Sequence, residues 1–73
     1  MESFEVERQE TITRQEAATR LRRIANLLSG DEDEAVFERG GMRFEVPLAD
    51  ELNFKIEIEM GSEEREIEIE LKW

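Results

Sequence analysis

Carboxylates that could do chemistry fall in two places in the sequence. The first is the run Asp31-Glu32-Asp33-Glu34, which offers the oxygen ligands of a calcium loop. Two positions break the pattern of such a loop, because Val36 stands where it needs glycine and Met42 where it needs a bidentate glutamate. We therefore interpret the run as a solvated acidic linker, with weak binding of a cation as the alternative.

The second place is the last third of the chain, where glutamates alternate with apolar residues. If these segments pair as a hairpin, Glu57 lies opposite Glu68 and Glu59 lies opposite Glu66. Paired carboxylates can form an acid–base dyad in which the pKa of one group is raised. Such a dyad needs a buried cleft, whereas these side chains are expected on an open face. We expect a hydrated acidic surface that can bind a basic partner, and catalysis is the alternative.

Arginines mark the outer side of a predicted helix near the N-terminus. They are Arg14, Arg20, Arg22 and Arg23, against a single acidic residue, Glu16. This basic side can pair with carboxylates of its own chain or bind an acidic partner, including the acidic surface of a second copy. We expect no nucleic acid there, because no aromatic residue is interleaved and the whole chain repels phosphate.

Trp73 is the last residue of the sequence, and its parity places it on the apolar side of the final strand. A terminal aromatic residue closes the end of a core and limits fraying. Tryptophan is also enriched at interface hot spots, so the alternative is that Trp73 anchors a protein interface. We favour core closure.

The arginines named above are positioned by a predicted helix. Thr13-Arg14-Gln15-Glu16 matches a capping box, and Gly30 stands where a C′ residue with positive φ is expected. Apolar residues between them recur with the helical period. The pattern predicts a helix over 14–29, whose apolar stripe is formed by Ala17, Leu21, Ile24 and Leu28.

Elsewhere the apolar residues alternate with polar ones, which indicates antiparallel strands with one buried face. A first strand is expected around Phe4 and Val6. Gly40-Gly41 predicts a hairpin turn that sets Phe37 opposite Phe44 and Glu38 opposite Arg43. A second turn at 61–64 sets Ile58 opposite Ile67 and Ile56 opposite Ile69, and Pro47 begins a bend between the hairpins.

These elements predict an α+β fold of order β-α-β-β-β-β. The apolar stripe of the helix and the apolar face of the sheet can both be buried if they pack against each other. We therefore expect the helix to pack on one face of a curved, mostly antiparallel sheet. The position of the first strand in that sheet is left open, at either edge or across a neighbouring subunit.

Composition narrows the classes of function. The 73 residues carry 20 Asp and Glu against 10 Lys and Arg, a formal charge of −10, with no cysteine and no histidine. Disulfides, zinc–thiolate sites, thiol nucleophiles and histidine bases are therefore excluded, and we expect no cofactor. The charge argues against nucleic acid or an anionic membrane as partner. No apolar run approaches the ~20 residues of a membrane span, and the acidic N-terminus is unlike a signal peptide, which predicts a cytoplasmic protein.

Several motifs together resemble the amphi-Trp domain family. They are the phenylalanine-acidic opening, the Thr-Arg-Gln-Glu-Ala-Ala helix start at Thr13, the Gly40-Gly41 hairpin and the amphipathic last strand ending in Trp73. The resemblance implies a small cytosolic protein made of one domain, residues 1–73, in a family with many members from salt-loving archaea. It brings no activity and no catalytic residues. The preference for arginine fits such an origin, whereas the preference for glutamate over aspartate departs from it.

We expect a non-enzymatic domain that binds a protein partner or associates with itself. The candidate contact residues are those of the basic helix, the acidic hairpin and the C-terminus: Arg20, Arg22, Arg23, Glu57, Glu59, Glu66, Glu68 and Trp73. The alternative is a cation-binding protein or a hydrolytic enzyme that uses the acidic hairpin surface. The regular strands would also suit a designed mini-protein, but the irregular bend after Pro47 favours a natural chain.

Overall fold

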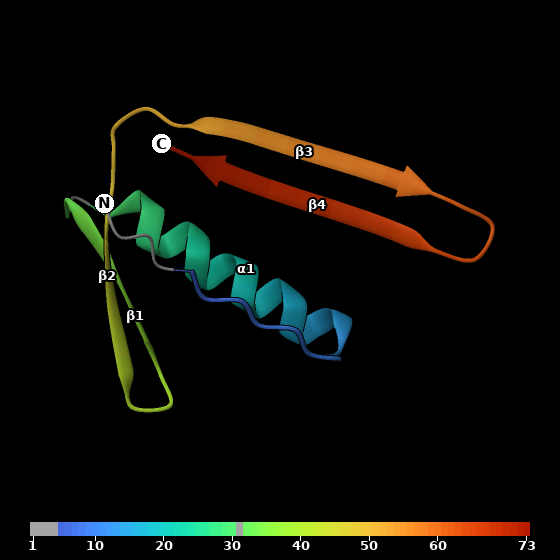
Figure 1. The fold of residues 1–73 in the computed structure, drawn as a ribbon, viewed down its shortest axis with the longest axis horizontal. Coiled ribbons are helices and arrows are strands. Elements are labelled where there is room, and N and C mark those ends of the chain that lie inside the picture. The colour runs from blue at the N-terminus through green and yellow to red at the C-terminus, as the bar shows by residue number, and fades with distance from the viewer. Residues whose placement is uncertain (1–4, 31) are drawn as a thin grey trace. The chain divides into compact units, whose positions relative to one another are not determined.

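A computed structural model describes residues 5–30 and 32–73 of the chain (Figure 1). Within these residues one helix is followed by four strands, each antiparallel to its partner, which confirms the α+β class. The chain divides into two compact units, the first ending at Gly30 and the second at Trp73, and each is described by itself. The elements are α1 (Arg14–Ser29), β1 (Glu34–Arg39), β2 (Met42–Pro47), β3 (Asn53–Met60) and β4 (Arg65–Lys72).

Helix α1 has the predicted bounds, and its start follows from Thr13. This residue is extended (φ −72°, ψ 158°), and its Oγ1 accepts a hydrogen bond of 3.0 Å from the Glu16 N–H. The Ala17 N–H donates to the Thr13 carbonyl at 3.0 Å, which opens the helical hydrogen-bond series. The side chain thus satisfies one of the N–H groups that a helix start leaves without a partner.

The end of α1 differs from the prediction. Gly30 has φ −71° and ψ 166°, so the expected positive φ at this residue was wrong. The Ser29 hydroxyl donates to the Asn26 carbonyl at 3.1 Å and so satisfies one of the last carbonyls of the helix. With that carbonyl bonded, the chain leaves the helix in an extended conformation that any residue can adopt.

The first hairpin joins β1 to β2 through a two-residue glycine turn. Gly40 and Gly41 have φ of +57° and +80°, as the primed turns of tight hairpins require. The predicted register is confirmed, with Phe37 opposite Phe44 and Glu38 opposite Arg43. Among the described residues only Ala35 of this hairpin is buried, at 3% exposure.

The second hairpin joins β3 to β4, and its register is also confirmed. Ile56 lies opposite Ile69 and Ile58 opposite Ile67, and the pairing closes at Met60 and Arg65. In the turn, the Gly61 N–H donates to the Glu64 carbonyl at 2.8 Å. The eight-residue strands are drawn side by side in Figure 1.

The expectation of one curved sheet is corrected to two separate two-stranded sheets, β1-β2 and β3-β4. Pro47 ends β2 without an N–H to donate, and the Leu48 N–H donates to the Asp33 carbonyl at 2.7 Å, within the same unit. Of the predicted first strand, Phe4 lies outside the described residues, and residues 5–12 form no strand. That the helix packs on a sheet stays a prediction.

Candidate functional site

The β3–β4 hairpin separates its charged and apolar side chains onto opposite faces, because successive residues of a strand point to opposite sides. We call the charged side the acidic face. Its centre holds the predicted carboxylate pairs, with Glu57 opposite Glu68 and Glu59 opposite Glu66. All four residues are exposed. The face consists of Lys55, Glu57, Glu59, Glu66, Glu68, Glu70 and Lys72.

Chemistry on the acidic face is limited by its exposure. None of its carboxylates is buried, and a dyad of the kind used in acid–base catalysis depends on desolvation and a cleft. The described part of the chain contains no group of three or more Asp, Glu, His or Cys side chains that could hold a metal ion. The arrangement supplies surface charge and repulsion between neighbouring carboxylates.

That repulsion leads to a prediction at the pair Glu59 and Glu66. We expect Glu59→Lys to raise the free energy of unfolding by about 0.5–1 kcal/mol, because a like-charge pair becomes an opposite-charge pair. The gain should shrink as salt screens the pair, and urea unfolding in about 0.05 M and about 0.5 M NaCl, followed by far-UV circular dichroism, measures it. Glu51→Lys makes the same charge change in the exposed bend. Equal gains from both variants would mean that net charge, and not the cross-strand pair, sets the cost.

Lysines at the other end of the acidic face offset part of this charge. The Lys72 Nζ lies 2.8 Å from the Glu70 Oε1, and the Lys55 Nζ lies 3.9 Å from the Glu57 Oε2. The Lys72 ammonium, with a smaller contribution from Lys55, holds the pKa of Glu70 below its usual value. The same ion pair raises the pKa of Lys72.

A pH dependence follows from the Glu70–Lys72 pair. Because the pKa of Glu70 is lowered in the folded chain, its contribution to stability is present above the usual glutamate pKa of about 4.3. That contribution is lost as the pH falls through the lower, folded-state pKa. We expect Lys72→Met to raise the pKa of Glu70, which a ¹³C titration of its carboxyl group by NMR measures. An unchanged titration would show that the ion pair does not form in solution.

The other side of the hairpin, which we call the apolar face, is the feature that the sequence patterns did not identify as a site. Those patterns assigned it to a buried core. In the structure Ile58 and Ile67 lie opposite each other and are 68% and 69% exposed. The face consists of Phe54, Ile56, Ile58, Met60, Ile67, Ile69 and Leu71.

The three candidate arginines of α1 are not equivalent. Arg20 donates from Nη1 to Glu10 and from Nε to Glu16, the latter at 3.3 Å. Both carboxylates raise the pKa of Arg20, and Arg8 together with Arg20 lowers the pKa of Glu10. Arg22 and Arg23 are exposed and form no ion pair with any described residue. Arg20 is therefore engaged within its own unit, whereas Arg22 and Arg23 are not.

Trp73 makes a contact that joins the two hairpins of the second unit. Its indole Nε1–H donates to the Pro47 carbonyl at 2.7 Å, at the end of β2. About half of the residue, 52%, is exposed. One edge of the indole is therefore fixed by a hydrogen bond while much of its surface stays accessible, and both predicted roles of Trp73 stay predictions.

The acidic run before β1 is described from Glu32 onward. Asp31 lies outside the described residues, and Glu32 and Asp33 are exposed. Asp33 contributes its backbone carbonyl to the hydrogen bond from Leu48, and Glu34 begins β1. This hydrogen bond joins the residue before β1 to the residue after β2, and both interpretations of the run stay predictions.

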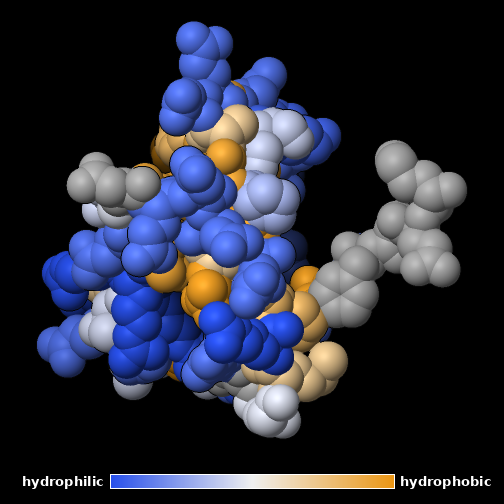
Figure 2. Space-filling view, turned by 90° about the vertical axis from the view of Figure 1, so that its left-hand side faces the viewer, coloured by the Kyte–Doolittle hydropathy of each residue, from blue (hydrophilic) through white to orange (hydrophobic). Residues whose placement is uncertain are grey.

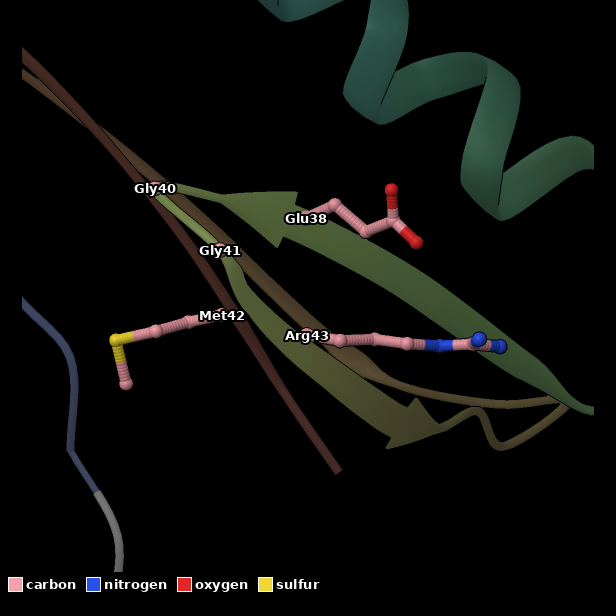
Figure 3. Close-up of a pocket in the computed structure, with 5 residues that line it drawn as sticks. All are labelled: Glu38, Gly40, Gly41, Met42 and Arg43. Atoms are coloured by element: carbon pink, nitrogen blue, oxygen red, sulfur yellow. The ribbon is translucent and has the colours of Figure 1, made fainter.

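A shallow depression of about 440 Å³ lies at the turn of the first hairpin. Figure 3 shows Glu38 and Arg43 extending together on one side while Met42 points to the other. The Arg43 Nη2 lies 3.2 Å from the Glu45 Oε1, so this arginine pairs along its own strand and not with its register partner Glu38. The lining residues, Glu38, Gly40, Gly41, Met42 and Arg43, include no nucleophile with a base beside it.

Charged and apolar side chains are both exposed on the described residues. Figure 2 shows charged and polar side chains over most of one side of the molecule, with smaller hydrophobic areas between them. Within residues 5–30 and 32–73 no helix has both the length and the apolar character needed to cross a membrane. Most of the apolar side chains of the β3–β4 hairpin are exposed.

Comparison with known proteins gives one match. The model of a family described as the Amphi-Trp domain matches residues 1–73, the whole chain. No curated protein and no solved structure matches. The matched range includes the helix start at Thr13, the glycine turn and the last strand with Trp73.

Proposed function

The chain belongs to the Amphi-Trp domain family, and from this premise we propose that it is a non-enzymatic protein-binding module that acts through the apolar face of its β3–β4 hairpin. The observation that carries the proposal is the exposure of Ile58 and Ile67, which lie opposite each other and are 68% and 69% exposed. A cytoplasmic location is part of the proposal, and fractionation of the source cells tests it.

Covering the apolar face would stabilise the β3–β4 hairpin. A two-stranded hairpin is marginally stable by itself in water. Burying one isoleucine side chain contributes about 1.5–3 kcal/mol, so the four isoleucines of the apolar face leave a large favourable term unused while they are exposed. A partner that covers Ile56, Ile58, Ile67 and Ile69 supplies that term.

The other surfaces support binding over catalysis. The acidic face offers solvated carboxylates without a cleft, and the depression at the first hairpin lacks a nucleophile paired with a base. Exposed apolar surface rimmed by charged residues is a mark of protein interaction sites. The apolar face is exposed in this way, and charged residues alternate with its members along both strands.

Site-specific photo-crosslinking tests the proposal without knowledge of the partner. A photoreactive amino acid replaces Ile58 on the apolar face or, as the matched control, the adjacent Glu59 on the acidic face. In an extract of cells that produce the chain, we expect protein adducts at position 58 to exceed those at position 59 by about tenfold. Equal yields at the two positions would contradict the assignment of the apolar face as the binding surface.

A further inference from the structure

We infer that the partner of the apolar face is a second copy of this chain, bound through the same face about a twofold axis. The inference rests on the proposed function and adds the chemistry of the occupant. Four observations on the β3–β4 hairpin carry it: the self-complementarity of the face, its lack of polar selectivity, the position of the charges and the exposed area.

The centre of the apolar face is complementary to itself. A twofold interface uses the same patch on both copies, so each patch must tolerate its own image. Here every central position holds isoleucine, because Ile56 pairs with Ile69 and Ile58 with Ile67. Arg65 is the one charged residue with the same parity, and it stands at the turn, opposite Met60. Two copies therefore meet without placing like charges against each other at the centre.

A foreign protein would find little on this face to select it. Specific recognition of a different partner uses charged or polar groups, or a pocket that admits an anchoring side chain. The central positions of the face carry aliphatic side chains alone. A second copy of the chain presents the same aliphatic surface.

The charges favour this arrangement over others between two acidic chains. Sheets that stack face to face lie about 10 Å apart, and with the apolar faces inward both acidic faces point outward. Their carboxylates are then separated by more than the Debye length of about 8 Å at physiological salt. Contact through the acidic faces would bring Glu57, Glu59, Glu66 and Glu68 of both copies together.

The exposed area reaches the lower limit of a specific interface. A specific interface needs about 1,000 Å² in total, or about 500 Å² from each copy. Six large apolar side chains of the face are between 45% and 82% exposed. Since such a side chain presents on the order of 150 Å² in full, the face offers on the order of 500 Å² per copy. The six are Phe54, Ile56, Ile58, Met60, Ile67 and Ile69.

Sedimentation equilibrium of the purified full chain, from about 1 to about 500 µM, tests the inference by mass action. We expect the mass to rise from that of one chain to that of two. The double variant Ile58→Lys/Ile67→Lys should raise the Kd at least about 100-fold, because two desolvated positions become charged. The control Glu59→Gln/Glu66→Gln makes the same change in net charge one residue along each strand and should leave the Kd within about threefold.

A measurement on the unmodified chain tests the inference even if the lysine variant does not fold. In a mixture of isotope-labelled and unlabelled chain, isotope-filtered NMR should show contacts between isoleucine methyl groups of different copies. A monomer mass at every concentration, a larger assembly, or intermolecular contacts on another surface would overturn the inference. If the chain is a monomer but photo-adducts at position 58 form with a different protein, the dimer inference is wrong and the proposed function is still supported. If the chain is a monomer and no adducts form, both are wrong.

Discussion

Replacing Trp73 with alanine is expected to lower the free energy of unfolding by about 2–3 kcal/mol. Two losses combine in this variant. The hydrogen bond of 2.7 Å from the indole Nε1–H to the Pro47 carbonyl disappears. The half of the residue that is covered, given an exposure of 52%, loses its packing as well.

Trp73→Phe separates the two losses, because phenylalanine keeps an aromatic ring but has no N–H. We expect this variant to cost about 1 kcal/mol, the typical value of one hydrogen bond. Urea unfolding followed by far-UV circular dichroism, at one fixed protein concentration, measures both variants. If both changed the free energy of unfolding by less than about 0.5 kcal/mol, the indole would have no structural part and its role would lie at an interface.

The second large effect is expected at the turn of the first hairpin. Gly41 has a φ of +80°, a conformation that costs a residue with a Cβ about 1–2 kcal/mol. A Cβ added at Gly40 or Gly41 would meet nothing within 4 Å, so the cost arises from the backbone alone. We expect Gly41→Ala to lower the free energy of unfolding by about 1–2 kcal/mol, and the double variant with Gly40→Ala by about twice as much.

Gly30→Ala is the matched control for the glycine turn. Gly30 has a φ of −71° and extended backbone, which alanine adopts without strain. Alanine there restricts the unfolded chain and is expected to leave stability unchanged or raise it by up to about 1 kcal/mol. Urea unfolding of both variants gives the comparison. A loss of the same size at Gly30 and Gly41 would show that the positive φ is not the cause.

The elements of this chain could be predicted because their signals are local. Thr13 and the residues just after it define the start of α1. The turn at Gly40 and Gly41 fixes the pairing of Phe37 with Phe44, since a hairpin register is set by its turn. The register of the second hairpin likewise places the carboxylates of β3 opposite those of β4, so this part of the candidate site could also be predicted.

What could not be predicted depends on contacts beyond neighbouring residues. Alternation shows that Ile58 and Ile67 share a face, but it does not show what covers that face. The acceptor of the Leu48 N–H is the carbonyl of Asp33, 15 residues earlier, and no local pattern indicates it. The partner of the Trp73 indole is likewise a backbone carbonyl with no sequence signature.

The hydrogen bond between Trp73 and Pro47 is expected to form later in folding than either hairpin. Each hairpin closes through a short turn, and such pairs form in about 1–10 µs. The indole and its acceptor are 26 positions apart in the chain, so their contact requires a larger loop to close after the hairpins exist. Because the chain contains a single tryptophan, its fluorescence would follow this later step while circular dichroism follows the strands. The fluorescence of Trp73, the residue after β4, is therefore expected to report when the two hairpins come together.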